Sequence, residues 1–160
     1  MIRVRPRQIA PAACSLLLAA CSVGSNSFAA SNASVDQGYT CPVSAKNLQY
    51  DVHGTITAHN GTAQTVKITA VTAVMTLAAV SGGWLQKVGD KFDAGDVIYT
   101  PTSVGAGSSA TLSVTIPSAC TGRAAKSPAA WGDYAVTFTV TTSAGRFKVD
   151  SQNKHRIATA

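Results

Sequence analysis

The chain has 160 residues with a formal net charge of +6, and its acidic residues are all aspartate. It is poor in the residues that fill helices and rich in threonine, valine and small residues, so we predict an all-β domain. Its basic residues are scattered, without the basic stripe and interleaved aromatics of nucleic-acid binding, so we expect no nucleic-acid partner.

The N-terminus has the layout of an export signal. Three arginines precede an apolar run from Ile9 to Ala20, which is too short to span a bilayer. The run ends in Leu18-Ala19-Ala20-Cys21, which resembles the bacterial lipobox. This resemblance implies a helical signal peptide over 1–20 and a lipid on Cys21 that anchors the protein to a membrane. Residues 21–40 are then expected to be a flexible tether.

A second interpretation of the signal stays open. Ser27-Phe28-Ala29 has the small-x-small pattern of a cleavage site for a secreted protein without a lipid. Both interpretations place the mature protein outside the cytoplasm.

The cysteines agree with export. Cys14 lies inside the signal, and Cys21 is the predicted lipid site. Cys41 and Cys120 remain as one pair, for which a disulfide is expected in an oxidising compartment. The alternative is two free buried thiols. A bond between them would close a loop of about 80 residues and contribute about 4 kcal/mol in the chain-entropy model.

Strands are predicted from alternating apolar and polar residues. The alternation is clear over Tyr50–Ala58, and the turn signal Asn60-Gly61 follows it. Thr65–Val80 is predicted as a long strand, with a helix as the alternative for Met75–Val80. Further strands are expected at Val97–Tyr99, at Thr111–Ile116 ended by Pro117, at Tyr134–Val140 and at Arg146–Val149. Loops are expected at Trp84–Gly95 and Thr121–Ala130, and a flexible tail over 151–160.

Three segments carry a resemblance to bacterial extracytoplasmic immunoglobulin-like modules; they are Gly54–Gly61, Gly105–Pro117 and Gly132–Phe138. The resemblance implies an antiparallel β-sandwich of about seven strands over 41–150. It also implies a tyrosine corner, in which the Tyr134 hydroxyl bonds to upstream backbone. Val136 stands where such domains have their second core cysteine, so the disulfide differs from the usual inter-sheet bond.

Metal-binding residues are few. His53 and His59 lie on one face of a predicted strand with Asp51. Six residues of a straight strand cover about 20 Å, so the two histidines cannot share one ion. Asp90, Asp93 and Asp96 follow one another at a spacing that is wrong for a calcium loop, and they are interpreted as turn residues instead. We therefore expect no metal.

Catalytic and cofactor motifs are not found. Ser108 and Ser109 do not lie in a nucleophile elbow, and Gly105-Ala106-Gly107 lacks the lysine of a phosphate loop. We expect no cofactor, no catalytic residue and no enzymatic activity.

Aromatic residues in predicted loops and at a strand end mark a binding surface formed by Trp84, Tyr99 and Trp131. The alternative is that the tryptophans cover the open ends of the core. The leading hypothesis is an exported, lipid-anchored, immunoglobulin-like adhesion module that binds a macromolecule of the cell envelope or its surroundings. The second hypothesis is a carrier of a small ligand or metal that uses Asp51, His53 and the 90–96 loop.

Overall fold

The computed structural model describes residues 27–42, 45, 47–120 and 130–159, and these residues form β-strands joined by turns and loops. A membrane-spanning helix is absent from these described ranges. In chain order the strands are β1 (Phe28–Val35), β2 (Gly38–Cys41), β3 (Leu48–Asn60), β4 (Val66–Ser81), β5 (Lys91–Asp96), β6 (Ile98–Thr100), β7 (Ser103–Val104), β8 (Ser108–Cys120), β9 (Trp131–Thr142) and β10 (Gly145–Thr159).

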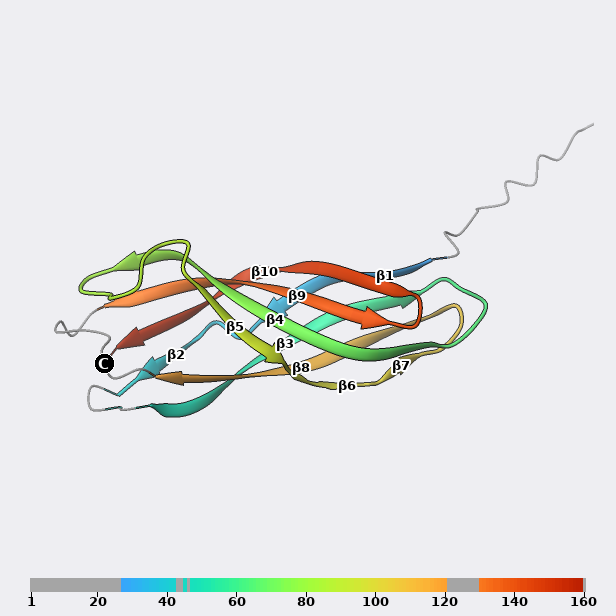
Figure 1. The fold of residues 1–160 in the computed structure, drawn as a ribbon, viewed down its shortest axis with the longest axis horizontal. Helices are drawn as coiled ribbons and strands as arrows, with labels where there is room; N and C mark the ends of the chain where they lie inside the picture. The colour runs from blue at the N-terminus through green and yellow to red at the C-terminus, as the bar shows by residue number, and fades with distance from the viewer. Residues whose placement is uncertain (1–26, 43–44, 46, 121–129, 160) are drawn as a thin grey trace, which may run out of the picture.

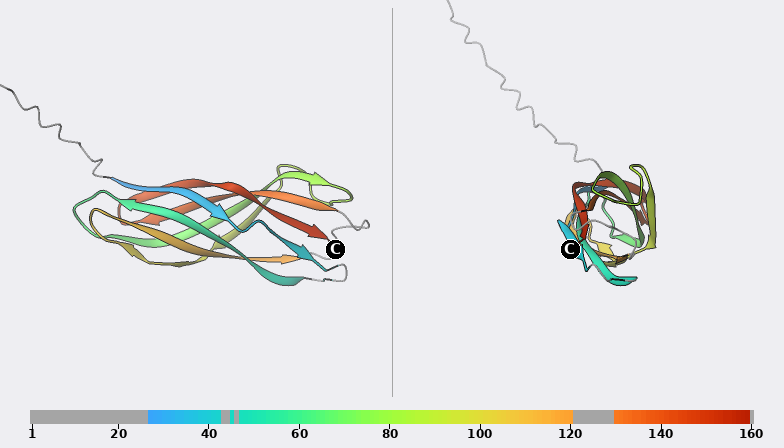
Figure 2. Two further views of the ribbon diagram at one scale, coloured as in Figure 1. Left: turned by 180° about the vertical axis from the view of Figure 1, so that it is seen from behind. Right: turned by 90° about the vertical axis from the view of Figure 1, so that its left-hand side faces the viewer.

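The strands form two layers that face each other across an apolar core (Figure 1). One layer has the order β5-β4-β9-β10, with β2 beside β10 and β7 beside β4, and the other has the order β1-β3-β8-β6. Pairing is antiparallel, except that β2 and β1 both meet β10 in parallel. Figure 2 shows that the sandwich is elongated, with its long strands running from one end to the other.

The core follows from the alternation of side chains along each strand. In β9 the even-numbered residues from 132 to 142 are buried, and the odd-numbered ones are half-buried. Phe138 of β9 belongs to the same buried cluster as Ile56 of β3 and Leu112 of β8, so the cluster spans both layers. Fully burying side chains of this size contributes about 1.5 to 3 kcal/mol each.

The predicted all-β sandwich is confirmed, and its pairing is antiparallel apart from the two parallel contacts of β10. The helical alternative for Met75–Val80 is wrong, because these residues continue β4. The number of about seven strands is too low, since β1, β2, β5 and β7 add to the six predicted stretches.

The chain passes from one layer to the other at Val97. β5 pairs with β4, whereas β6 pairs with β8 from Ile98 opposite Thr115. Val97 is buried, and its N–H donates to the Val71 carbonyl oxygen at 3.1 Å. After Val97 the chain connects the edges of the two layers, since β6 pairs with β8 and β7 pairs with β4. On the β5 side, β5 and β8 belong to different layers, and no described strand lies between them.

A second crossing lies at Asp36, between β1 and β2. β1 pairs with β3, and β2 pairs with β10. The Asp36 N–H donates to the His53 carbonyl oxygen at 2.8 Å, and Asp36 Oδ2 accepts from the His53 N–H at 3.1 Å. Asp36 Oδ1 lies 2.6 Å from Nδ1 of the buried His155 in β10. One side chain therefore contacts both layers.

The predicted tether over 21–40 is wrong from Phe28 onward, because β1 and β2 are part of the sandwich. Phe28 is 4% exposed, and its ring lies 5.0 Å from that of Phe147. The strand lacks a readable alternation because its register shifts around Asn32, which has a φ of +48°. Asparagine tolerates this left-handed region better than most residues.

The predicted flexible tail over 151–160 is also wrong, because β10 continues to Thr159. In this part of β10, polar side chains occupy inward-facing positions that are usually apolar in a strand. Ser151 Oγ accepts from the Val136 N–H at 3.2 Å. The Asn153 amide group bonds to both the N–H and the carbonyl of Val35, at 3.0 and 2.6 Å.

Two strand ends also differ from the prediction. β5 begins at Lys91, inside the predicted loop Trp84–Gly95, and β8 continues past Pro117 to Cys120. Proline is tolerated in a strand where its nitrogen has no neighbour to donate to. β6 pairs only with Ser113–Thr115, so Pro117 has no partner in β6. Of the predicted loop 121–130, all but Ala130 lies outside the described residues.

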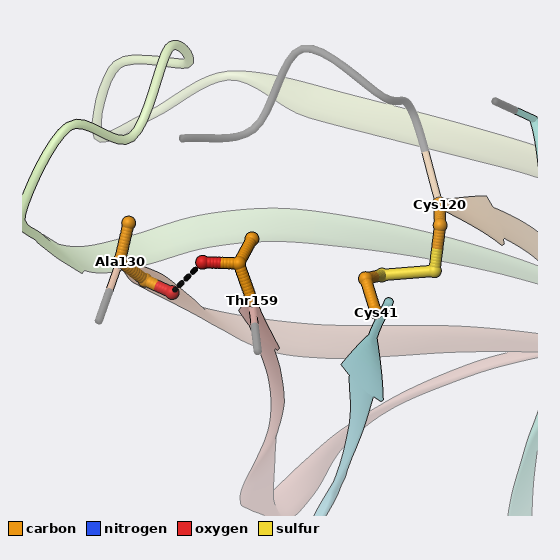
Figure 3. The surroundings of a disulfide bond; sticks show 4 residues. All are labelled: Cys41, Cys120, Ala130 and Thr159. Atoms are coloured by element: carbon orange, nitrogen blue, oxygen red, sulfur yellow. Dashed lines mark hydrogen bonds between the residues drawn. A yellow bond between two sulfur atoms is a disulfide. The ribbon is translucent and has the colours of Figure 1, made fainter. Parts of the chain in front are cut away.

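The predicted disulfide is confirmed between the ends of β2 and β8, which excludes two free thiols (Figure 3). At the same end of the sandwich, Thr159 Oγ1 donates to the Ala130 carbonyl oxygen at 3.2 Å. β3 runs from this end of the sandwich to the other. Its first residue, Leu48, pairs with Cys120, and its last residue, Asn60, pairs with Phe28. The first strand therefore begins at the end opposite the disulfide.

Phe28→Ala is expected to lower the free energy of unfolding by about 3 kcal/mol, because it removes a buried ring and leaves a cavity. Urea denaturation followed by tryptophan fluorescence measures this change. The control is Ala29→Ser, at an exposed position of the same strand, for which a change below about 0.5 kcal/mol is expected. Equal midpoints for Phe28→Ala and the control would contradict the assignment of β1 to the core.

The double variant C41A/C120A is expected to lose about 4 kcal/mol of stability, since the bond closes a long loop, with 79 residues of sequence separation. Denaturation of the oxidised protein, the reduced protein and the double variant tests this. The reduced protein and the double variant should have the same free energy of unfolding. A double variant as stable as the oxidised protein would contradict the expectation.

Candidate functional site

A groove opens between β5 and β8, on the side of Val97 where the two layers are not joined. Its volume is about 470 Å³. The lining comes from both layers and includes Phe92 and Ala94 of β5, Ser118 of β8 and the disulfide at its end. The groove thus exists because β5 pairs with β4 in one layer and β8 pairs with β3 in the other, while β6 is too short to close the seam between them.

The floor of the groove is aromatic and apolar. Tyr50 of β3, Met75 of β4 and Tyr134 of β9 line it, together with Trp84 from the loop after β4. Trp84 lies over Gly132, where a Cβ atom would come within 2.8 Å of the indole. Any larger residue at Gly132 would push the indole out of its place.

Tyr134 does not form the predicted tyrosine corner. Its hydroxyl donates to Oε1 of Gln86, a side chain in the loop after β4, and not to upstream backbone. Burial raises the pKa of Tyr134, and the nearby Trp84 indole partly offsets this effect. The bond fixes the loop over the end of the groove instead of fixing a strand corner.

Tyr50 is a buried polar side chain of the floor, at 9% exposure. Its ring stacks on Tyr39 at 4.2 Å between centroids and lies 6.0 Å from the ring of His155. The hydroxyl forms no hydrogen bond of normal geometry among the described residues, although Ser118 is near enough to affect its ionisation. Burial raises the pKa of Tyr50 to about 12, so the hydroxyl is protonated at neutral pH.

Trp84 offers a second unused polar atom. Its Nε1 is buried and forms no hydrogen bond of normal geometry among the described residues, although the Tyr134 hydroxyl is near enough for the indole to lower the Tyr134 pKa. An indole N–H can only donate. Buried groups of this kind cost free energy when they stay unpaired, so each marks a position that gains from a partner.

The lip of the groove carries exposed apolar side chains. Leu85 is 63% exposed and Phe92 is 44% exposed. Backbone bonds place the loop that carries Leu85, since the Gly89 N–H donates to the Leu77 carbonyl and the Leu77 N–H donates to the Asp90 carbonyl. Large apolar side chains that remain exposed beside an apolar groove are typical of a binding site.

The rim of the groove is acidic. Asp51 and Asp93 border it from the two layers. Both positions alternate with inward-facing neighbours, so their carboxylates lie toward the outer faces. Asp93 Oδ1 accepts from the Gly95 N–H at 2.9 Å. Neither carboxylate forms an ion pair with a described side chain.

The three aromatic residues predicted as one binding surface are not brought together. Trp84 lies in the groove, on the inner side of Gly132. Trp131 is half-buried on the outer face of β9, where the Arg156 guanidinium lies 4.0 Å from its ring centroid. Tyr99 belongs to β6 in the other layer and donates to the Ile68 carbonyl oxygen at 3.3 Å. Only Trp84 therefore belongs to the groove.

Arg156 also holds Asp133, through bonds of 2.7 and 2.9 Å to the two carboxylate oxygens. This contact lowers the pKa of Asp133. The guanidinium, the carboxylate and the Trp131 ring thus satisfy one another on the surface.

The residues of the predicted metal or ligand site are separated. His53 lies 3.4 Å from Thr115 Oγ1, and His59 lies 3.0 Å from Ser109 Oγ. In the described part of the chain, no three His, Cys, Asp or Glu side chains gather as a metal site requires. Asp90 accepts the Lys87 N–H in the loop before β5, as the turn interpretation expects. That interpretation is wrong for Asp93 and Asp96, which lie in β5. The predicted lipid site, Cys21, lies outside the described residues.

No protein-family model matches this chain, and no curated protein sequence matches it. Solved structures with a similar arrangement include a Northeast Structural Genomics Consortium target, SoR45, with 16% identity and a TM-score of 0.45 over 83% of this chain and 87% of that one. A PapD-like domain of human CEP192 has 13% identity and a TM-score of 0.34, over 80% and 83%. The CooA pilin subunit of enterotoxigenic Escherichia coli has 13% identity and a TM-score of 0.27, over 81% and 97%. These scores assign the chain to no family.

Tyr50→Phe is expected to remove the tyrosine ionisation that titrates near pH 12. The pKa is raised in the folded state, so stability is full below about pH 10 and falls as the pH rises from there toward 12. Phenolate absorbance against pH, in the folded and urea-unfolded protein, measures this. At pH 7 the variant should be as stable as the native protein, because the hydroxyl it lacks has no partner. A loss above about 2 kcal/mol would show that the hydroxyl has one.

Proposed function

We propose that the protein is a non-enzymatic binding module of the extracytoplasmic space, and that it holds an apolar group of another molecule in the groove between β5 and β8. The supporting observation is the groove itself, with an aromatic floor, exposed apolar side chains at its lip and two buried polar atoms that form no hydrogen bond of normal geometry among the described residues. Its volume lies within the range of small-molecule sites, about 300 to 1,000 Å³.

The chemistry of the groove favours binding over catalysis. The described titratable side chains that border it are Asp51, Asp93 and the two tyrosines, while its two cysteines are joined in the disulfide. A general base works best with a pKa near the working pH, and the tyrosines are shifted away from neutrality. The groove therefore offers a shaped apolar surface, without a poised proton acceptor.

The strand edges on either side favour a compact apolar group over an added β-strand. Pro117 has no N–H to offer at the edge of β8, and β5 carries Lys91 and Asp93. Proline and charged residues are the usual means by which proteins block pairing at a sheet edge. The same groove would serve either function: it could hold a small ligand in a carrier, or an apolar group of a macromolecule in an adhesion module.

The proposed location outside the cytoplasm is supported by the disulfide, since such bonds persist in oxidising compartments. The place of Phe28 in the core supports lipidation at Cys21 over the alternative cleavage. Processing after Ala29 would remove Phe28 from β1, whereas processing before Cys21 would leave the strand whole.

Binding can be tested with N-phenyl-1-naphthylamine, an uncharged dye that fluoresces in apolar surroundings. The proposal expects saturable enhancement with the native protein. Phe92→Ser removes an apolar side chain from the lip, and we expect it to weaken dye binding about tenfold.

Ile98→Ser is the matched control, because Ile98 is also an exposed apolar residue, at 75%, but lies on β6 outside the groove. It should bind the dye as the native protein does. No saturable binding, or equal losses in the two variants, would contradict the proposed site.

A further inference from the structure

We infer that the groove binds an amphiphile with an uncharged apolar body and a cationic head; this inference rests on the proposed function of the groove. The body would occupy the floor between the layers, and the head would remain at the rim. Three observations on the described residues lead to this class of ligand.

The first observation is the apolar character of the interior. Met75 is 1% exposed, and the aromatic side chains of Tyr50, Tyr134 and Trp84 complete the floor. No described side chain on the floor is charged at neutral pH. A charged group carried to this depth would lose its hydration without compensation, so the inserted part of the ligand must be uncharged.

The second observation is that Tyr50 Oη and Trp84 Nε1 are buried and form no hydrogen bond of normal geometry among the described residues, although Ser118 lies near the first and the Tyr134 hydroxyl near the second. Because the indole N–H can only donate and the Tyr50 hydroxyl is protonated, both positions favour a ligand with acceptor character. The face of an aromatic ring or an ether or carbonyl oxygen in the apolar body would meet this requirement.

The third observation is the sign of the rim. Asp51 of β3 and Asp93 of β5 line the groove from the two layers, with their carboxylates toward the outer faces beside it. Among the described residues that line the groove, these two are the only charged ones. β5 and β8, the strands on either side of the seam, carry two aspartates and one lysine, in a chain that is basic as a whole. A cationic head is attracted there and an anionic head is repelled.

The experiment compares three probes with one apolar body and different heads. They are 1-naphthylmethylammonium, 1-naphthalenemethanol and 1-naphthoate. Binding is followed by NMR through the indole N–H signals of the two tryptophans. The signal of Trp84 should move on titration, and that of Trp131, on the outer face of β9, should stay.

The ammonium probe is expected to bind about three- to tenfold more tightly than the alcohol, and the carboxylate more weakly than both. In the variant D51N/D93N this order should collapse, so that the ammonium and the alcohol bind alike. Asp96→Asn is the matched control, since it removes a carboxylate from β5 that does not border the groove, and it should keep the native order. Raising the salt to about 0.5 M should also reduce the preference.

Equal binding of the three probes, or tightest binding of the carboxylate, would overturn the inference while leaving the groove as a binding site. Failure of every probe and of the neutral dye to bind would overturn the proposed function itself. A preference for the ammonium that survives in D51N/D93N would place the cation elsewhere and would equally overturn the inference.

Discussion

The passage of the chain between the layers at Val97 sets where this sandwich is closed and where it is open. Before Val97 the chain is a strand of one layer, and after it the chain is a strand of the other. A single extended segment therefore joins the layers over part of their length. Before Val97 it pairs with β4 and leaves the edge of β8 that faces away from β3 without a partner among the described strands. The groove is the direct consequence of this arrangement, and residues of the buried core form its floor.

The opposite seam is held in a different way. There the chain changes layers at Asp36, whose backbone and carboxylate contact His53 and His155 in the two layers. Polar contacts of this kind contribute less free energy than their short distances indicate, because both groups lose hydration. They fix position well, however, since Asp36 bonds to a residue in each of the two layers. One seam is thus held by polar contacts, and the other is held by an apolar residue over part of its length and open over the rest.

Most of the sheet could be predicted from the sequence, because β3, β4, β8 and β9 alternate between apolar and polar residues. β1 and the second half of β10 could not. A bulge at Asn32 interrupts the first, and inward-facing Ser151 and Asn153 replace apolar contacts with hydrogen bonds in the second. The disulfide could be predicted because Cys41 and Cys120 are the two cysteines that remain after the signal and the lipid site are set aside. The groove was missed because it depends on which layer β5 joins, and Lys91–Asp96 alternates over too few residues to show a strand. Trp84 was identified, whereas Tyr50 and Phe92 were not.

The two ends of the sandwich differ in what they carry. β1 begins at one end, and the loop after β4 lies at the other (Figures 1 and 2). The disulfide and the groove, whose lining includes Trp84 and Leu85 of that loop, also lie toward this second end. A strand as long as β3 measures about 40 Å from end to end. Under the proposed anchoring at Cys21, the rigid body of the protein would itself act as a spacer. It would hold the groove away from the lipid surface.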